Sequence, residues 1–274
     1  MSPMDISNDN DLNVLSDGLV QTDDYYQANS PNSVSQWRFT DFGHVGDLSR
    51  DGSVHATDEV FNAASHLVAA LLSCLGSALL IVESSSMGEP WKIVAFSLYG
   101  ASLMFLFGAS TLHHSLVGPK IEPFLRMVDY LAIFPLISGT FSPLCLVFFH
   151  DSTIGWTFFG TIWILAICGM IMTACIHSKM PKWLSMTLYI TMGWLGACMT
   201  YWLAPFLGLG GLILFVLGGL FFTVGGYIFY TEQPNPIPGT FGFHEIWHVL
   251  VMLGAVTHWA MMFWYVLPYE AGED

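Results

Sequence analysis

Two histidines four residues apart, His244 and His248, lie in the last apolar stretch of the sequence. The spacing H-x-x-x-H places two imidazoles on one face of a helix, where both can bind one zinc ion. By itself this short motif is weak, because it also arises by chance. His114, in another apolar stretch, would add a third neutral nitrogen and leave a fourth position for water, as in catalytic zinc sites. The alternative is that these histidines only hydrogen-bond lipid headgroups.

Two further side chains could act beside such a zinc ion. Asp129 is predicted to orient or deprotonate the water that zinc activates, and the alternative for this residue is an ion pair with Arg126 one turn earlier. Ser110, one turn before His114, could donate to Asp129 or to a developing oxyanion. The alternative for Ser110 is a hydrogen bond to its own helix backbone. We predict Asp129 and Ser110 as catalytic residues and Arg126 as a supporting one.

A polar group opens the first apolar stretch. Glu59, Asn62 and His66 lie within about 60° of one another on a helix and are predicted to fix the tautomers of the metal ligands. His66 could also compete as a ligand. His113 points about 100° away from its neighbour His114 and is expected to meet lipid headgroups, and the sequence offers no partner for His258.

The elements that carry these residues are apolar runs long enough to cross a membrane. Hydrophobic residues make up 54% of the chain and charged residues only 10%, against about 25% charged residues in soluble domains. Each run is near the roughly 20 residues that cross the hydrocarbon core as a helix. The runs predict an all-α bundle of seven transmembrane helices at residues 60–82, 92–116, 127–149, 154–176, 183–204, 207–230 and 243–267.

The basic residues predict how this bundle is oriented. Six of them fall on the side of the N-terminus and only Lys92 falls on the other side. Because basic loops stay in the cytoplasm, the N-terminus is predicted inside and the C-terminus outside. The starts of the first, third and seventh helices and the end of the second then share the cytoplasmic leaflet, so their polar residues are expected to meet.

Glycines recur every seven residues in the sixth predicted span, at Gly211, Gly218 and Gly225. Seven residues are about two helical turns, so these glycines form one smooth stripe. The stripe predicts close packing against another helix.

The N-terminal segment differs from the rest of the chain. Residues 1–58 carry ten acidic and two basic side chains. We predict a disordered acidic cytoplasmic tail over residues 1–56, followed by a transmembrane domain over 57–270. The acidity excludes nucleic acid as a partner, because no cluster of cations could replace phosphate counterions, and any protein partner of the tail is left unidentified.

Four stretches resemble the hemolysin III family, within the progestin and adiponectin receptor superfamily. They read EVFNAASHLVAALL, IVAFSLYGASLMFLFGASTLHHSL, DYLAIFPLISGTFSPL and GGLFFTVGGYIFY…FGFHEIWHVLVMLGAVTHW. The similarity covers about residues 58–267 and implies a seven-helix fold with the N-terminus inside.

The resemblance also implies a ligand set. The superfamily, which is similar to alkaline ceramidases, binds zinc through three histidines that match His114, His244 and His248. Its serine and aspartate match Ser110 and Asp129, and its polar residues of the first helix match Glu59, Asn62 and His66. One departure is Tyr130 after Asp129, where the family usually has histidine.

Together these features predict an integral multi-pass protein of a plasma membrane or bacterial inner membrane. The leading hypothesis is a zinc-dependent hydrolase that cleaves the amide of a membrane lipid, its substrate entering laterally between helices. The alternative is a receptor-like or hemolytic, pore-forming membrane protein whose zinc is structural.

Overall fold

The computed structural model describes residues 47–48, 55–176 and 180–270. The chain divides into two units, residues 1–38 and 39–274, and all described residues belong to the second unit. Most of the predicted acidic tail therefore lies outside the described residues. Within the tail, β1 (Asp47–Leu48) pairs with β2 (Ala56–Thr57) as two short antiparallel strands, which the sequence did not indicate.

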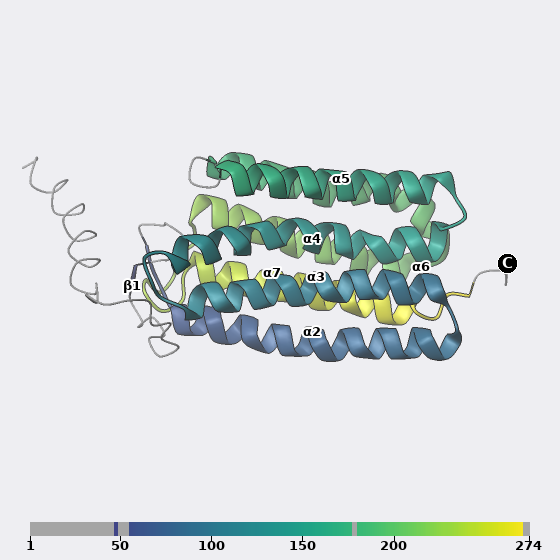
Figure 1. The fold of residues 1–274 in the computed structure, drawn as a ribbon, viewed down its shortest axis with the longest axis horizontal. Helices are drawn as coiled ribbons and strands as arrows, with labels where there is room; N and C mark the ends of the chain where they lie inside the picture. The colour runs from purple at the N-terminus through teal and green to yellow at the C-terminus, as the bar shows by residue number, and fades with distance from the viewer. Residues whose placement is uncertain (1–46, 49–54, 177–179, 271–274) are drawn as a thin grey trace, which may run out of the picture. The chain divides into compact units, whose positions relative to one another are not determined.

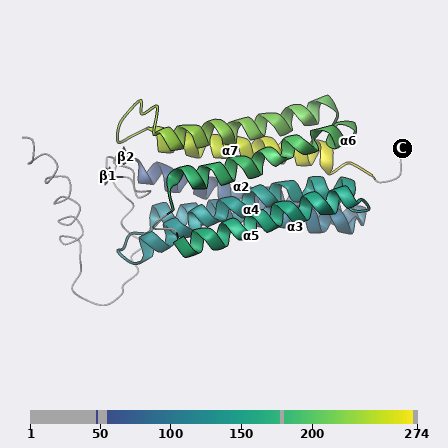
Figure 2. The same cartoon turned by 90° about the horizontal axis from the view of Figure 1, so that it is seen from above.

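Helices make up almost all of the rest, as the sequence predicts. Within the described part of the chain, six helical segments are long and apolar enough to cross a membrane. They lie side by side along a common direction (Figures 1 and 2). The helices are α2 (Glu59–Met87), α3 (Pro90–Ser115), α4 (Ile121–Phe149), α5 (Thr153–Ile176), α6 (Lys182–Thr231) and α7 (Phe243–Met261), which the π-helical turn η2 (Met262–Val266) continues.

The long helix α6 folds back on itself. Its backbone leaves the helical conformation at Gly208, where φ is 56° and ψ is −173°, a combination that glycine adopts without strain. Two contacts join the arms on either side: Trp194 Nε1 donates to Thr223 Oγ1 at 3.2 Å, and Lys182 Nζ pairs with Glu232 at 2.9 Å. Figure 2 shows the two arms side by side.

Local sequence signals define both ends of α2. Asp58 precedes the helix and its carboxylate accepts a hydrogen bond from the backbone N–H of Phe61 at 2.9 Å, as an N-cap residue does. This cap places Glu59 in the first turn. At the other end Gly88 adopts the left-handed conformation, with φ of 73°, and stops the helix. α2 therefore extends five residues beyond the predicted end at residue 82.

The glycine stripe of α6 packs closely against α7 and η2. A side chain at Gly211 would meet Tyr265, one at Gly218 would meet the ring of His258, and one at Gly225 would lie 2.8 Å from Trp247. This is the close packing that the seven-residue repeat predicts. The second arm of α6 and α7 can thus approach each other along their whole common length.

Gly225→Ala is expected to destabilise the protein, while Gly219→Ala on the neighbouring face is expected to be neutral or stabilising. The added methyl group at position 225 overlaps the Trp247 ring, whereas nothing lies within 4 Å of one at position 219. Overpacking of this kind costs about 1–3 kcal/mol. Thermal unfolding of both variants in the same detergent measures the difference, and equal melting temperatures would contradict the packing role.

Candidate metal centre

Three histidines meet at one end of the bundle, although they come from distant parts of the chain. His114 lies in the last turn of α3, while His244 and His248 lie in the first two turns of α7. The Nε2 atom of His244 lies 3.3 Å from Nε2 of His114 and 3.1 Å from Nε2 of His248. All three side chains are buried. The structure therefore brings together the three residues predicted as metal ligands.

The spacing of these nitrogens fits a metal ion. Nitrogens bound tetrahedrally to zinc at about 2.0–2.1 Å lie about 3.3 Å apart, close to the distances between the Nε2 atoms. A neutral imidazole carries a proton on one ring nitrogen and a lone pair on the other. A single proton between two Nε2 atoms would therefore satisfy only one of the two contacts. A cation between the three rings would satisfy all the lone pairs. His114, His244 and His248 could therefore hold a metal ion.

A carboxylate fixes the ring of His114. Glu59 is fully buried, and its Oε2 atom accepts a hydrogen bond from His114 Nδ1 at 2.6 Å. Because Nδ1 donates, the Nε2 atom of His114 presents its lone pair to the other two histidines. The hydroxyl of Thr57, at the end of β2, donates to the Oε1 atom of Glu59 at 2.8 Å. This chain of hydrogen bonds runs from the strand before α2 to a metal-facing nitrogen.

Thr57→Val should weaken metal binding about tenfold, the lower end of the effect seen when a residue that orients a metal ligand is lost. The substitution keeps the shape of the side chain but leaves Glu59 Oε1 without this donor. Thr57→Ser, which retains the hydroxyl, serves as the matched control. Competition with a metal-binding dye measures the affinity, and equal values for the valine and serine variants would contradict the role of the hydroxyl.

The structure adds Glu245, which the sequence analysis did not select as a site residue. Its buried carboxylate accepts hydrogen bonds from the backbone N–H of Asp58 at 2.7 Å, from Asn62 Nδ2 at 3.3 Å and from the N–H of Gly242 at 2.7 Å. It thereby joins the start of α7 to the start of α2 and positions its neighbour His244. The sequence did contain a signal for this role, because a glutamate in the third position of a helix often bonds to the backbone at the helix start.

Two more histidines lie against the three ligand candidates. The ring of His66 stacks on that of His248, with centroids 3.7 Å apart and an interplanar angle of 13°. His113 is only 1% exposed, so the prediction that it meets lipid headgroups was wrong. The physical reason is tertiary packing: α3 packs against both α2 and α4, and the ring of His113 lies beside that of His114, with centroids 4.7 Å apart.

A cavity of about 170 Å³ begins at this cluster. Ser110 and Asp129, the predicted catalytic residues, lie in its wall together with His113, His244 and His248. A carboxylate oxygen of Asp129 lies within 4.8 Å of a ligand nitrogen of His113 and of His114. Two of the three ligand candidates, His244 and His248, therefore share a cavity wall with the predicted catalytic residues. Arg126, predicted to support Asp129, is half-buried one turn earlier on α4.

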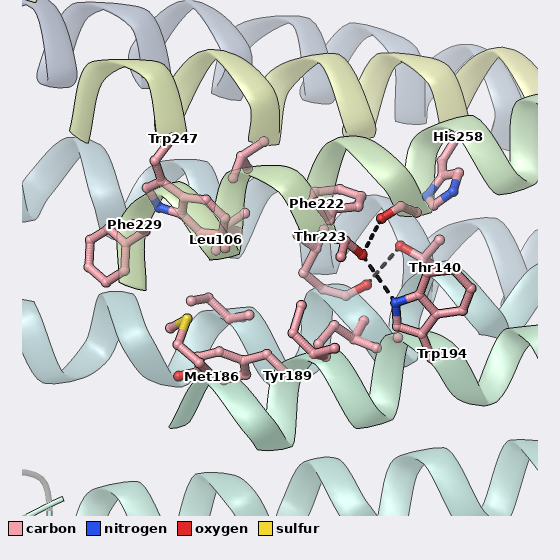
Figure 3. Close-up of a pocket in the computed structure, with 18 of the residues that line it drawn as sticks. Leu106, Thr140, Met186, Tyr189, Trp194, Phe222, Thr223, Phe229, Trp247 and His258 are labelled. Atoms are coloured by element: carbon pink, nitrogen blue, oxygen red, sulfur yellow. Dashed lines mark hydrogen bonds between the residues drawn. The ribbon is translucent and has the colours of Figure 1, made fainter. Parts of the chain in front are cut away.

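From the cluster the cavity continues between α4, α7 and both arms of α6. Figure 3 shows Trp247, Phe229 and Met186 toward one end of this part of the cavity and His258 toward the other. Most of its lining is aliphatic or aromatic. The hydroxyls of Thr140 and Thr223 donate to carbonyls of their own helices, so these donors are already used within the protein. The cavity can therefore take a long apolar group whose polar end lies at the histidines.

The chain matches known proteins along most of its helical part. The family described as "Haemolysin-III related" matches residues 54–259. The chain belongs to the hemolysin III family. With six apolar helices among the described residues, this membership makes it an integral multi-pass membrane protein.

Three relatives show how far the similarity extends. Hemolysin-3 of Bacillus cereus is 35% identical over 211 residues, which cover 77% of this chain and 93% of that protein. The Hemolysin-3 homolog of Bacillus subtilis (strain 168) is 34% identical over 212 residues, 77% of this chain and 94% of that protein. Heptahelical transmembrane protein 4 of Arabidopsis thaliana is 26% identical over 85% of this chain and 62% of that protein.

Proposed function

We propose that this protein is a membrane hydrolase that uses zinc, held by His114, His244 and His248, to cleave the amide bond of a membrane lipid. The observation that carries the proposal is a cluster of three converging imidazole nitrogens, two of which belong to His244 and His248 in the wall of an apolar cavity. Catalytic zinc sites have three protein ligands and an open position. An apolar cavity beside that position favours a lipid over a polar substrate.

In the proposed topology, the chain crosses the membrane seven times and has its N-terminus in the cytoplasm. The fold-back at Gly208 divides α6 into two arms, and each arm exceeds the roughly 20 residues needed to cross the bilayer. The name of the Arabidopsis relative, a heptahelical transmembrane protein, agrees with this number. Six basic residues against one support a position of the histidine cluster near the cytoplasmic face.

The reaction assigns separate tasks to the residues of the cavity wall. His114, His244 and His248 would hold the zinc ion, which would supply Lewis-acid chemistry and a nucleophile at neutral pH. A water oxygen adds to the amide carbon, and the Asp129 carboxylate accepts the proton that this water releases. Asp129 then passes the proton to the leaving nitrogen as the carbon–nitrogen bond breaks, which yields a fatty acid and an amine. The Ser110 hydroxyl donates to the oxyanion that develops on the carbonyl oxygen.

The lipid chain is proposed to enter the cavity from the side, between the arms of α6. Trp194 on the first arm and Val216 on the second both line the cavity and are 46% and 47% exposed. Because these side chains are exposed both to the cavity and to the outer surface of the bundle, an opening between the cavity and the bilayer is proposed here. A lipid can then move from the bilayer to the histidines without crossing water.

The decisive experiment incubates purified, zinc-loaded wild-type protein with a ceramide that carries a fluorescent acyl chain. Release of the fluorescent fatty acid is expected, because the site would cleave the amide bond. Removal of the metal with a chelator should abolish this release, and added zinc should restore it. A protein with about one zinc ion per chain that releases nothing from ceramide or other N-acyl lipids would refute the hydrolase.

A membrane-lytic function with a structural zinc is the second candidate. The observation that favours it is the name Hemolysin-3, which the two Bacillus relatives carry. Dye leakage from liposomes treated with the purified protein tests it. Leakage without amide hydrolysis would favour this candidate over the hydrolase.

A further inference from the structure

His258 lies in the cavity wall, far from the other histidines. It follows His248 by ten residues on α7, which corresponds to about 15 Å along the helix axis. Its side chain is only 7% exposed, and the ring lines the cavity (Figure 3). The proposed hydrolysis assigns it no task, so a polar group is buried in an apolar region without a known purpose.

One hydrogen bond defines the state of this ring. The Nε2 atom of His258 lies 3.1 Å from the carbonyl oxygen of Phe215 on the second arm of α6. Because a carbonyl only accepts, Nε2 carries the proton, and the Nδ1 atom of a neutral ring is then an acceptor. Nδ1 is buried, and none of the described residues offers it a hydrogen bond.

The close approach of α6 holds the ring in this position. A side chain at Gly218 would overlap the imidazole of His258, so the glycine allows the ring to reach the Phe215 carbonyl. A buried acceptor without a donor is destabilising, because it has lost its hydrogen bonds to water. A donor that arrives with a ligand would remove this cost.

Neighbouring polar side chains do not supply that donor. The hydroxyl of Thr140 donates to the carbonyl of Leu136, and the hydroxyl of Thr223 donates to the carbonyl of Gly219. Trp194 Nε1 donates to Thr223 (Figure 3). These donors are all used within the protein, so none of them satisfies the buried Nδ1 atom of His258, whose ring lines the cavity.

We propose that His258 selects lipids whose acyl chain carries a hydroxyl group, which donates a hydrogen bond to Nδ1. The hydroxyl would lie about 15 Å along the chain from the end held at the histidine cluster. This inference rests on the proposed function only in taking a lipid chain as the ligand of the cavity. It adds a second polar contact that discriminates among chains of similar length.

The test compares the binding of 12-hydroxystearic acid and stearic acid to the purified, zinc-loaded protein in detergent. The two probes share a carboxylate and a chain length and differ in one hydroxyl. Wild type is expected to bind the hydroxylated acid about five- to tenfold more tightly, the effect of one added hydrogen bond. Equal affinities would overturn the inference and indicate that an ordered water satisfies His258.

Variants locate the source of the preference. His258→Phe should abolish the discrimination while binding stearic acid within a few-fold of wild type. Gly218→Ala, which displaces the ring, should also abolish it, and Gly219→Ala, with nothing within 4 Å of the new methyl group, should keep it. A preference that survives in both His258→Phe and Gly218→Ala would overturn the assignment to His258.

The result is independent of catalysis, so the two proposals fail separately. Equal binding of both acids by a protein that hydrolyses ceramide would refute the role of His258 alone. A clear preference without hydrolysis would support His258 and refute the hydrolase. Failure to bind either acid would refute the lipid cavity and, with it, both proposals.

Discussion

The double variant His244→Ala, His248→Ala is expected to purify with essentially no zinc, whereas wild type is expected to carry about one ion per chain. Two of the three converging nitrogens are lost, and a single imidazole at His114 cannot retain the ion against a chelating buffer. Elemental analysis of the detergent-purified proteins measures the metal content. Circular dichroism and size-exclusion chromatography show whether the variant is still folded.

A matched control is His150→Gln. This histidine follows the last residue of α4, at the end of the helix opposite to Asp129 and the histidine cluster. The His150 ring contacts the carbonyl of Leu146 and lies away from the cluster, so zinc content should remain at the wild-type value. Zinc retained in the double variant would contradict the site. Loss of zinc together with loss of the fold would identify the metal as structural and favour the lytic or receptor-like alternative.

Asp129→Asn is expected to lower amide hydrolysis by about 100- to 10,000-fold, the usual contribution of a general base, with zinc still bound. The amide has nearly the same shape as the carboxylate but cannot accept the proton of the attacking water. The residue lines the cavity beside the histidines, so the effect should appear in kcat. Single-turnover release of a labelled fatty acid, with zinc content measured on the same sample, provides the test.

Asp151→Asn is the control, because Asp151 lies in the connection between α4 and α5 with its carboxylate 93% exposed. It should hydrolyse the lipid at the wild-type rate. Unchanged hydrolysis in Asp129→Asn would remove this residue from the mechanism. Loss of both zinc and activity would instead make Asp129 a ligand, an arrangement compatible with its closeness to His113 and His114.

Apolar length was sufficient to predict where the helices lie. The predicted end of the first span at residue 82 is too early, because Glu83 and the serines after it are polar and do not continue the apolar run. In the structure the hydroxyls of Ser84 and Ser85 bond to carbonyls of their own helix, which lets polar residues remain helical until Gly88. The predicted gap between the spans ending at 204 and beginning at 207 contains Pro205, but proline removes only one donor, and the chain turns at Gly208 instead.

The histidine cluster was predictable because helix periodicity and the alternating direction of the spans place its members at one depth. Contacts that depend on packing were not predictable. The burial of His113 depends on which helices flank α3, and the hydrogen bond from Thr57 to Glu59 depends on the path of the chain before α2. Glu245 was visible as a helix-start residue, but its donors on α2 follow only from the tertiary structure.

The separation of His114 from His244 along the chain has a consequence for biosynthesis. Translation proceeds from α2 to α7, so His114 and its partner Glu59 are made long before His244 and His248. The proposed three-histidine site would therefore be complete only after α7 has been made. Chains that stop before α7 would lack His244 and His248, two of its three ligands.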